Sequence, residues 1–176
     1  MILLAALGCA PIRDPLVVAC GVPDQTAWWQ PDGGSSEEVT GLLGHTPAEA
    51  DAVLTLTDSG TLTLGAGSFY GSVWVDSAVT ATISGCGEGH TTLHAGWGPE
   101  LHPDTLLVQS EEAALHVEAL TLQGSGDRDR AAFLVHYGAL SLSQVTVQGW
   151  DVNSAIFDGA LSLAGVTLTD NAGDHQ

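Results

Sequence analysis

Hydrophobic and polar residues alternate along most of the chain after Val53, in short runs that favour β-strands. Leu54 and Leu56 begin this alternation, and Thr or Ser occupies many of the positions between the aliphatic side chains. Gly, Asp and Asn interrupt the runs at short intervals, and no helical pattern lies between them. The pattern therefore predicts an all-β structure built from many short strands.

The C-terminal part of this pattern repeats itself. The copies are GALSLSQVTVQGW from Gly138, GALSLAGVTLTDN from Gly159, AALHVEALTLQGSG from Ala113, and a fainter VTATISGCG from Val79. Aligning them places Leu122 one repeat before Val147, and it places Ile83 39 residues before Leu122. Repeats of this length are typical of a solenoid, in which each coil buries its apolar face only against its neighbours.

The alignment also predicts which side chains form the core. Aliphatic residues of the clear copies should stack between coils that pair as parallel strands. The predicted columns are Leu115–Leu140–Leu161, Val117–Leu142–Leu163, Leu120–Val145–Val166 and Leu122–Val147–Leu168. Two columns should face outward, His116–Ser141–Ser162 and Thr121–Thr146–Thr167. Segments 95–105 and 124–130 are expected to be loops inserted between coils.

One segment carries a more specific motif, DSGTLTLGAGSFYGSVWVDSAVTATISGCGEGHTTL, from Asp58 to Leu93. It resembles the opening coil of right-handed parallel β-helix proteins of the pectin-lyase-like superfamily. The matching positions are Gly60, Leu62, Leu64, Gly67, Phe69, Ile83, Gly85, Gly87, Thr92 and Leu93. The resemblance covers residues 48–171 and implies a right-handed parallel β-helix. The repeat spacing between Thr61 and Asn171 predicts about four coils.

Three parts are predicted before the coils. MILLAALGC resembles a bacterial lipoprotein signal that would be lipidated at Cys9, so residues 1–9 are expected to direct export. An ordinary export signal and a buried apolar segment are the alternatives. Residues 10–45 are expected to be a tether or an irregular lead-in. Thr46-Pro47-Ala48-Glu49 has the form of a capping box and predicts a short helix, Pro47 to Val53, that covers the first coil of a β-helix domain at 46–176.

Charge and cysteine content suggest where the protein acts. The chain has 21 acidic residues, three Arg and no Lys, and its net charge of -18 would repel nucleic acid and anionic membrane surfaces. If Cys9 is lipidated, Cys20 and Cys86 remain as an even pair that could form a disulfide in an oxidising compartment. No window approaches about 20 apolar residues, so no membrane span is predicted. We expect a secreted, outer-membrane or cell-surface protein of a bacterium.

One cluster of acids and bases is a candidate for catalysis. It consists of Asp127, Arg128, Asp129 and Arg130. Its functional interpretation is a calcium-assisted polysaccharide lyase site, and the alternative is a solvated turn with mutual salt bridges. Lyases of the resembled superfamily take several acids from adjacent coils, and Asp104, Asp151 and Asp158 form no convincing second row. The histidines form no metal signature, so no cofactor is predicted and calcium is the one ion left open.

Aromatic residues are the candidates for ligand binding. Trp74, Trp97 and Trp150 could line an outer face and stack on sugar rings, or they could plug loops. The Trp28–Trp29 pair could form an exposed sugar-stacking platform or pin a loop onto the core.

These observations predict a surface module with a structural, adhesive or glycan-binding role. The alternative is a fragment of a pectate-lyase-like polysaccharide lyase or hydrolase that lacks part of its site. Expected partners are a polysaccharide or another surface protein, without nucleic acid and with membrane contact only through a lipid anchor. The final repeat is as apolar as the internal ones, which predicts a fragment of a longer β-helix and end-to-end self-association through Leu161 to Leu168.

Overall fold

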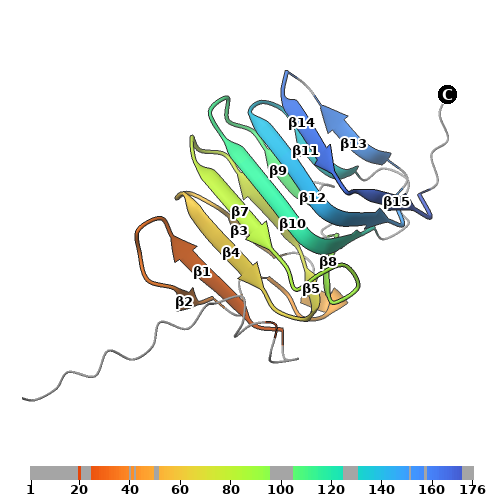
Figure 1. Ribbon diagram of the computed structural model, residues 1–176, viewed down its shortest axis with the longest axis horizontal. Helices are drawn as coiled ribbons and strands as arrows, with labels where there is room; N and C mark the ends of the chain where they lie inside the picture. The colour runs from red at the N-terminus through yellow and green to blue at the C-terminus, as the bar shows by residue number, and fades with distance from the viewer. Residues whose placement is uncertain are drawn as a thin grey trace, which may run out of the picture.

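The computed structural model is an all-β parallel β-solenoid, in which the chain winds repeatedly around one elongated core (Figure 1). The structure describes residue 20 and residues 25–39, 41, 43–49, 52–95, 105–124, 131–150, 152–156 and 158–171. The predicted insertions at 95–105 and 124–130 fall between strands and lie almost wholly outside these residues.

The described residues contain fifteen strands and one short 3-10 helix, joined by turns and loops. The strands before the first insertion are β1 (Ala27–Pro31), β2 (Glu37–Glu38), β3 (Val53–Thr55), β4 (Gly60–Leu64), β5 (Gly67–Tyr70), β6 (Ser72–Val75), β7 (Thr80–Ser84) and β8 (Thr91–His94). Those after it are β9 (Leu106–Val108), β10 (Ala114–Gln123), β11 (Ala131–Val135), β12 (Ala139–Gln148), β13 (Val152–Ile156), β14 (Ala160–Ala164) and β15 (Thr167–Thr169).

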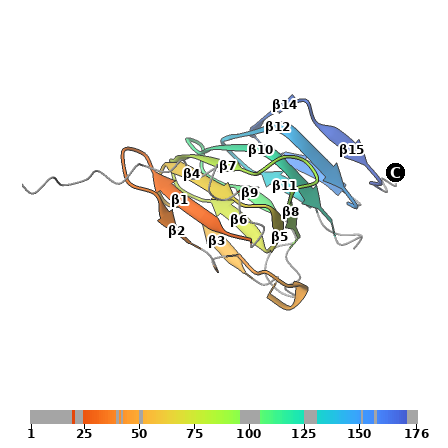
Figure 2. The same cartoon turned by 60° about the horizontal axis from the view of Figure 1, so that its bottom comes forward.

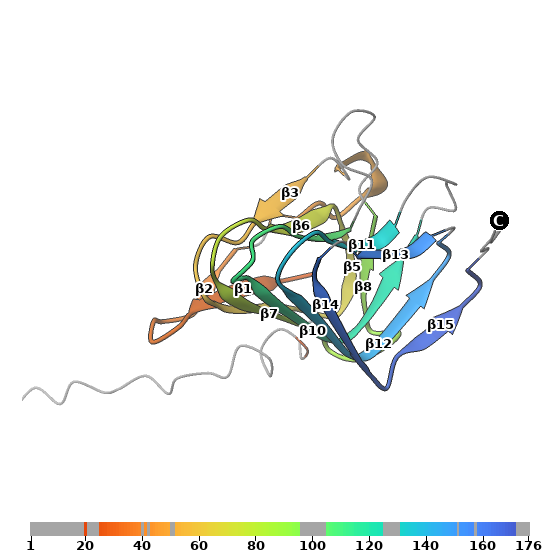
Figure 3. The same cartoon turned by 90° about the horizontal axis from the view of Figure 1, so that it is seen from above.

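The strands form two sheets that lie on opposite sides of the core (Figure 3). The long sheet has ten strands, follows the order β14-β12-β10-β7-β4-β1-β2, and also contains β5, β8 and β15. The short sheet has five strands in the order β13-β11-β9-β6-β3. Each coil contributes one strand to the short sheet. The described residues form a solenoid of about three turns, close to the four coils that the repeat spacing predicts.

The predicted core ladder is confirmed for the three clear repeats. The inward columns that pair as predicted are Leu115–Leu140–Leu161, Val117–Leu142–Leu163, Leu120–Val145 and Leu122–Val147–Leu168. Val166, the third member expected beyond Val145, lies between β14 and β15 and packs against the core. Both outward columns, His116–Ser141–Ser162 and Thr121–Thr146–Thr167, are in the expected register. Like aliphatic side chains stack at the spacing of neighbouring parallel strands, about 4.8 Å, and this excludes water from the core.

The register of the fainter repeat differs from the prediction. Ile83 pairs with Val117, not with Leu122, and Leu122 pairs with Leu93. In this coil the equivalent of β10 is divided into β7 and β8, with residues 85–90 between them. Because residues 85–90 lie between β7 and β8, the sequence spacing to the partner residue in β10 differs for the two strands. A single repeat spacing therefore cannot align both β7 and β8 with β10.

Long strands bend once in each of the last three coils. Ala119 in β10 and Gln144 in β12 adopt φ angles of 55° and 53°, and Gly165 takes the corresponding position with a φ of 62°. A left-handed residue reverses the side-chain alternation for one step, so both halves of the strand direct aliphatic residues into the core.

A β-hairpin from the segment expected to be a tether or an irregular lead-in, residues 10–45, covers one end of the long sheet. β1 pairs antiparallel with β4 over five residues, and β2 pairs antiparallel with β1. Within β1, Trp29 packs against the core next to Leu62. The hairpin therefore covers the edge of β4 at this end of the long sheet, an edge that would otherwise be left unpaired (Figure 2).

The capping helix predicted from Pro47 to Val53 is not shown, although the hydrogen bonds of the capping box at Thr46 are present. A 3-10 helix spans Pro47–Glu49, and Val53 already belongs to β3. The Glu49 carboxylate accepts hydrogen bonds from the backbone N–H groups of His45 at 2.9 Å and Thr46 at 3.1 Å, and also from the Thr46 hydroxyl. These bonds, above all that from the His45 backbone, lower the pKa of Glu49.

Candidate functional site

A shallow groove crosses the turns that lead from the short sheet to the long sheet in three successive coils. These turns precede β10, β12 and β14. The corner groove is lined by Glu111, Glu112, Ala113, Ala114, Tyr137, Gly138, Ala139, Asp158, Gly159 and Ala160. Its volume is about 760 Å³ and it is widely open to solvent, so an extended ligand has access along its length.

Small residues form the floor of the corner groove. Hydrogen bonds join successive turns, from the Ala139 N–H to the Ala113 carbonyl oxygen and from the Ala160 N–H to the Gly138 carbonyl oxygen, both at 2.9 Å. Neighbouring turns therefore keep the regular rung spacing of about 4.8 Å. The result is a floor of backbone and methyl groups without bulky side chains.

Two glycines preserve this floor. Gly138 has a φ of 74°, and a Cβ atom there would lie 2.4 Å from the Ser110 carbonyl oxygen and 2.5 Å from that of Ala113. A Cβ atom at Gly159 would lie 2.4 Å from a methyl group of Val135. Any larger residue at either position would displace the turns, so the shape of the groove depends on both glycines.

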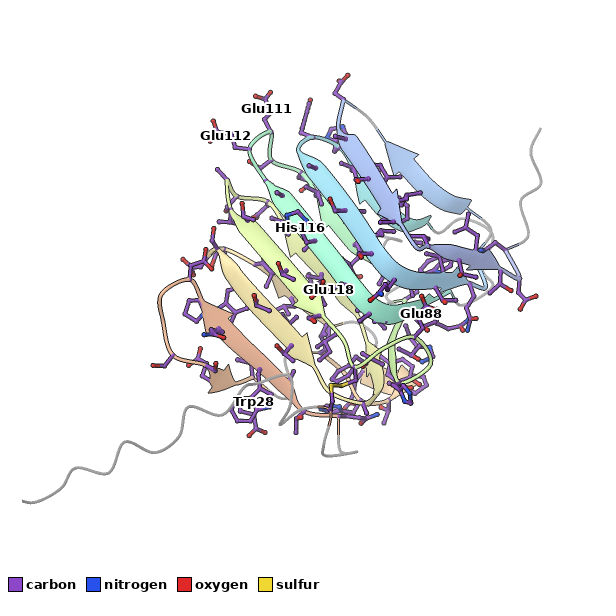
Figure 4. All side chains as sticks on the ribbon, viewed as in Figure 1. Trp28, Glu88, Glu111, Glu112, His116 and Glu118 are labelled. Atoms are coloured by element: carbon purple, nitrogen blue, oxygen red, sulfur yellow. A yellow bond between two sulfur atoms is a disulfide. The ribbon has the colours of Figure 1, made fainter. Side chains whose placement is uncertain are left out.

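Tyr137 and three carboxylates form the walls of the corner groove. Tyr137 is partly buried, and its ring lies 4.7 Å from that of His136 with a tilt of 57°. Glu111 and Glu112 are exposed on the turn before β10, where Figure 4 shows them projecting from the tip. Asp158 is exposed two rungs further along. No Lys or Arg lines the groove, so its potential is negative.

A second row of side chains follows the outer face of the long sheet. Tyr70 and His94 stack with ring centroids 4.4 Å apart and an angle of 11°, and burial lowers the pKa of His94. The register continues from His94 to Gln123 and Gln148, whose amides form a hydrogen bond of 2.6 Å. Each of these polar groups is engaged by its neighbour in the column. The row therefore strengthens the stacking of coils more than it offers free groups to a ligand.

A smaller cleft lies at the hairpin end of the solenoid. It has a volume of about 150 Å³ between β1 and the open edge of β3, and Trp29, Val39, Leu54 and Leu62 are among its lining residues. This is below the roughly 300 Å³ typical of small-molecule sites. The corner groove is the better candidate.

Several residues predicted from the sequence lie outside the described part of the chain. These are Cys9, Trp97, Asp104, Asp127, Arg128, Asp129, Arg130 and Asp151. The proposed lyase cluster and the lipidation site are therefore untested by the structure. Asp158 is the one of the three acids weighed for a second row that the structure describes, and it lines the corner groove together with Tyr137.

The tryptophans divide between core and surface. Trp150 is 2% exposed and donates its indole N–H to the Leu122 carbonyl oxygen at 3.3 Å, so it plugs the coil and is not available to stack on sugars. Trp74 lies in β6 and is partly buried. Trp28 and Trp29 are also partly buried in β1, and Trp28 lies at the edge of the long sheet in Figure 4. The pair belongs to the hairpin and is not a projecting platform.

A disulfide joins Cys20 to Cys86, the pair that remains when Cys9 is set aside. It attaches the segment before the hairpin to the loop between β7 and β8. The same loop is held to the long sheet by the Glu88 carboxylate, which accepts a hydrogen bond of 3.0 Å from the Thr146 hydroxyl.

Within the described ranges, no three His, Cys, Asp or Glu side chains converge in a way that could hold a metal ion. The same residues contain no helix long and apolar enough to cross a membrane.

Comparisons with known family models, curated proteins and solved structures find no match to this chain. The solenoid fold therefore rests on the structure itself, and the resemblance to the pectin-lyase-like superfamily stays a prediction.

Sequence reasoning missed Glu111, Glu112 and Tyr137. A signal was present, since each lies immediately before a repeated strand, as does Asp158. The repeat pattern indicates the inward columns, whereas the groove is built from the turns between the repeated strands. Residues that directly precede each copy of a repeated strand share one corner of a solenoid, and they were the positions to compare.

Proposed function

We propose that this protein is an exported β-solenoid that binds a neutral polysaccharide in the corner groove, with no catalytic role. The observation that carries the proposal is that Tyr137 lines the groove together with a floor of small residues and the carboxylates of Glu111, Glu112 and Asp158. An aromatic face packs against the apolar face of a sugar ring, and carboxylate oxygens accept hydrogen bonds from sugar hydroxyls.

The charge of the protein supports a neutral ligand over an acidic one. The net charge is -18, and every charged residue that lines the groove is acidic. An anionic polysaccharide would meet repulsion along the whole groove, because no Lys or Arg lines it. The shallow floor favours an extended chain that lies across successive turns.

Export is supported by the disulfide between Cys20 and Cys86, because such bonds persist in oxidising compartments. We further propose that Cys9 carries a lipid that holds the module at a bacterial surface. Mass spectrometry of the membrane fraction tests this: lipid on Cys9 that is absent in Cys9→Ser supports the anchor. An unmodified Cys9 contradicts it.

Binding is tested with the full chain against immobilised neutral and acidic polysaccharides, with and without calcium. We expect binding to at least one neutral polysaccharide, and a loss of at least about tenfold in Tyr137→Ala. The matched control is Tyr70→Ala, because Tyr70 is also a partly buried tyrosine but belongs to the other row. This control should bind as the parent chain does.

Two results would contradict the glycan proposal. One is equal binding by Tyr137→Ala and the parent chain. The other is displacement of the polysaccharide by a Lys-rich peptide as strong as that by free oligosaccharide, which would mean that negative charge alone governs the groove.

The alternative function, a polysaccharide lyase or hydrolase fragment, depends on Asp127 to Arg130 and has no support from the described residues. Its discriminating observation is product formation from a bound polysaccharide. Reducing ends or unsaturated products that disappear in Asp127→Asn and Asp129→Asn would favour the enzyme over the binding module.

A further inference from the structure

We propose that the corner groove selects a polysaccharide with β-1,4 linkages and binds one sugar ring on each coil. This inference rests on the glycan-binding function proposed above and names the class of polysaccharide. It follows from the positions that the groove's side chains take in successive turns. The residues that carry it are Glu112, Tyr137 and Asp158, which all line the groove.

These three residues occupy the same position in three successive turns. Ala114, Ala139 and Ala160 pair in register across β10, β12 and β14, and each of the three residues stands two positions before one of these alanines. The N–H of each alanine donates a hydrogen bond of 2.9 Å to the carbonyl oxygen of the residue that precedes the strand in the coil before. Matching residues of the stacked turns therefore follow one another at about 4.8 Å.

The column alternates between acidic and aromatic residues. Glu112 and Asp158 supply carboxylates from turns that are two rungs, or about 10 Å, apart, and Tyr137 belongs to the turn between them. In the turn before Glu112 the same position belongs to Ala78, which offers neither a carboxylate nor a ring. Among the described turns, the alternation is therefore found where the groove lies.

An extended chain of β-1,4-linked glucose or mannose rings fits this spacing. Both linkage bonds of each ring are equatorial, so the chain is nearly straight and advances by close to one rung spacing per ring. Successive rings are flipped about the chain axis, so the same hydroxyl group returns to the same side at every second ring. Carboxylates two rungs apart can then accept hydrogen bonds from equivalent hydroxyls, while the ring between them packs on Tyr137.

Other linkages do not follow a straight row of coils. An α-1,4 linkage leaves each ring through one axial bond, and the two bonds of a β-1,3-linked ring are set at an angle to each other, so both chains curve into helices. A curved chain cannot keep successive rings on successive coils. The glycines and alanines of the groove floor also favour a flat ribbon, because they present no side chain that would fill the inside of a curve.

The test compares four neutral tetrasaccharides by calorimetric titration of the full chain. Cellotetraose and mannotetraose have β-1,4 linkages, maltotetraose has α-1,4 linkages and laminaritetraose has β-1,3 linkages. At least one of the first two should bind at least about tenfold more tightly than either of the last two. Equal affinities, or a preference for maltotetraose or laminaritetraose, overturn this inference and leave the glycan-binding function standing. Absence of binding to every neutral polysaccharide overturns both.

Glu112→Ala tests the two-rung spacing with shorter members of the series that binds more tightly. A trisaccharide spans both carboxylates, so the variant should bind it at least about fivefold more weakly than the parent chain does. A disaccharide can lie on Tyr137 and Asp158 instead, so its affinity should fall less. An equal loss for the two lengths overturns the arrangement of one ring per coil.

The matched control is Glu118→Ala. Glu118 is also an exposed glutamate of the same coil, but Figure 4 shows it on the sheet, away from the tip that carries Glu112. Removing the same charge there should leave both affinities unchanged. An equal effect of the two variants would mean that net charge governs binding and would also overturn the inference. Asp158 is a poorer site for substitution, because its φ is 53° and alanine there would strain the turn. Circular dichroism verifies that each variant is folded.

Discussion

The indole N–H of Trp150 donates a hydrogen bond to the carbonyl oxygen of Leu122, 3.3 Å away in the preceding coil. The Trp150 backbone N–H in turn donates to the side chain of Asn171 in the following coil, at 2.9 Å. One buried residue, through its side chain and its backbone, therefore connects three coils at the same corner.

Replacing Trp150 by Ala should lower the free energy of unfolding by about 3 to 5 kcal/mol, because it leaves a large cavity and an unpaired carbonyl. Trp150→Phe should cost less, since part of the packing remains. Denaturant titration measures both changes. If Trp150 instead contacted a ligand, the alanine variant would unfold as the parent chain does and lose polysaccharide binding.

Leu142 should tolerate no charge. It is 1% exposed and lies between Val117 and Leu163 in neighbouring coils. Leu142→Asp would bury an unpaired carboxylate there and should cost more than about 4 kcal/mol, enough to unfold the domain. The control is Ser141→Asp at the adjacent outward position, which should be nearly neutral. Thermal unfolding followed by circular dichroism compares the two, and a cooperative transition in Leu142→Asp would contradict the register.

The disulfide should contribute substantially to stability. It closes a loop with a sequence separation of 66 residues, and this restricts the unfolded chain. Cys20→Ser combined with Cys86→Ser should lower the free energy of unfolding by about 2 to 5 kcal/mol. Reductant should lower the stability of the parent chain by a similar amount and leave the double variant unchanged. Sensitivity of the double variant to reductant would mean that another bond is involved.

His94 should make the protein less stable in mild acid. Burial lowers its pKa from the usual value of 6.5, so below that pH the unfolded state binds the proton more readily than the folded state. The stability that neutral His94 contributes to the folded state is fully present above pH 6.5. It is lost as the pH falls from 6.5 toward the pKa of His94 in the folded state. His94→Gln, which copies Gln123 of the next coil, should remove this part of the pH dependence. Unfolding titrations at several pH values measure it, with NMR titration of His94 as the direct reading.

The sequence by itself determined the architecture and the register of the last three coils. A coil can bury Leu115 or Val117 only against a neighbour, so like aliphatic residues at matching positions specify parallel stacking. The same alternation separates inward residues such as Leu142 from outward ones such as Ser141, because successive side chains of a strand point to opposite faces. These features are local or strictly periodic, which is why they could be predicted.

Only the tertiary structure decided where the pattern is broken. The pairing of Ile83 with Val117 depends on how many residues the loop between β7 and β8 contains. The repeat pattern of the sequence does not predict the length of that loop. The hairpin that pairs β1 with β4 is a long-range antiparallel contact outside the repeat. The corner groove unites Glu111, Tyr137 and Asp158 from three turns. Side-chain direction in a turn follows the backbone of that turn rather than an alternating pattern, so these residues come together only once the coils are stacked.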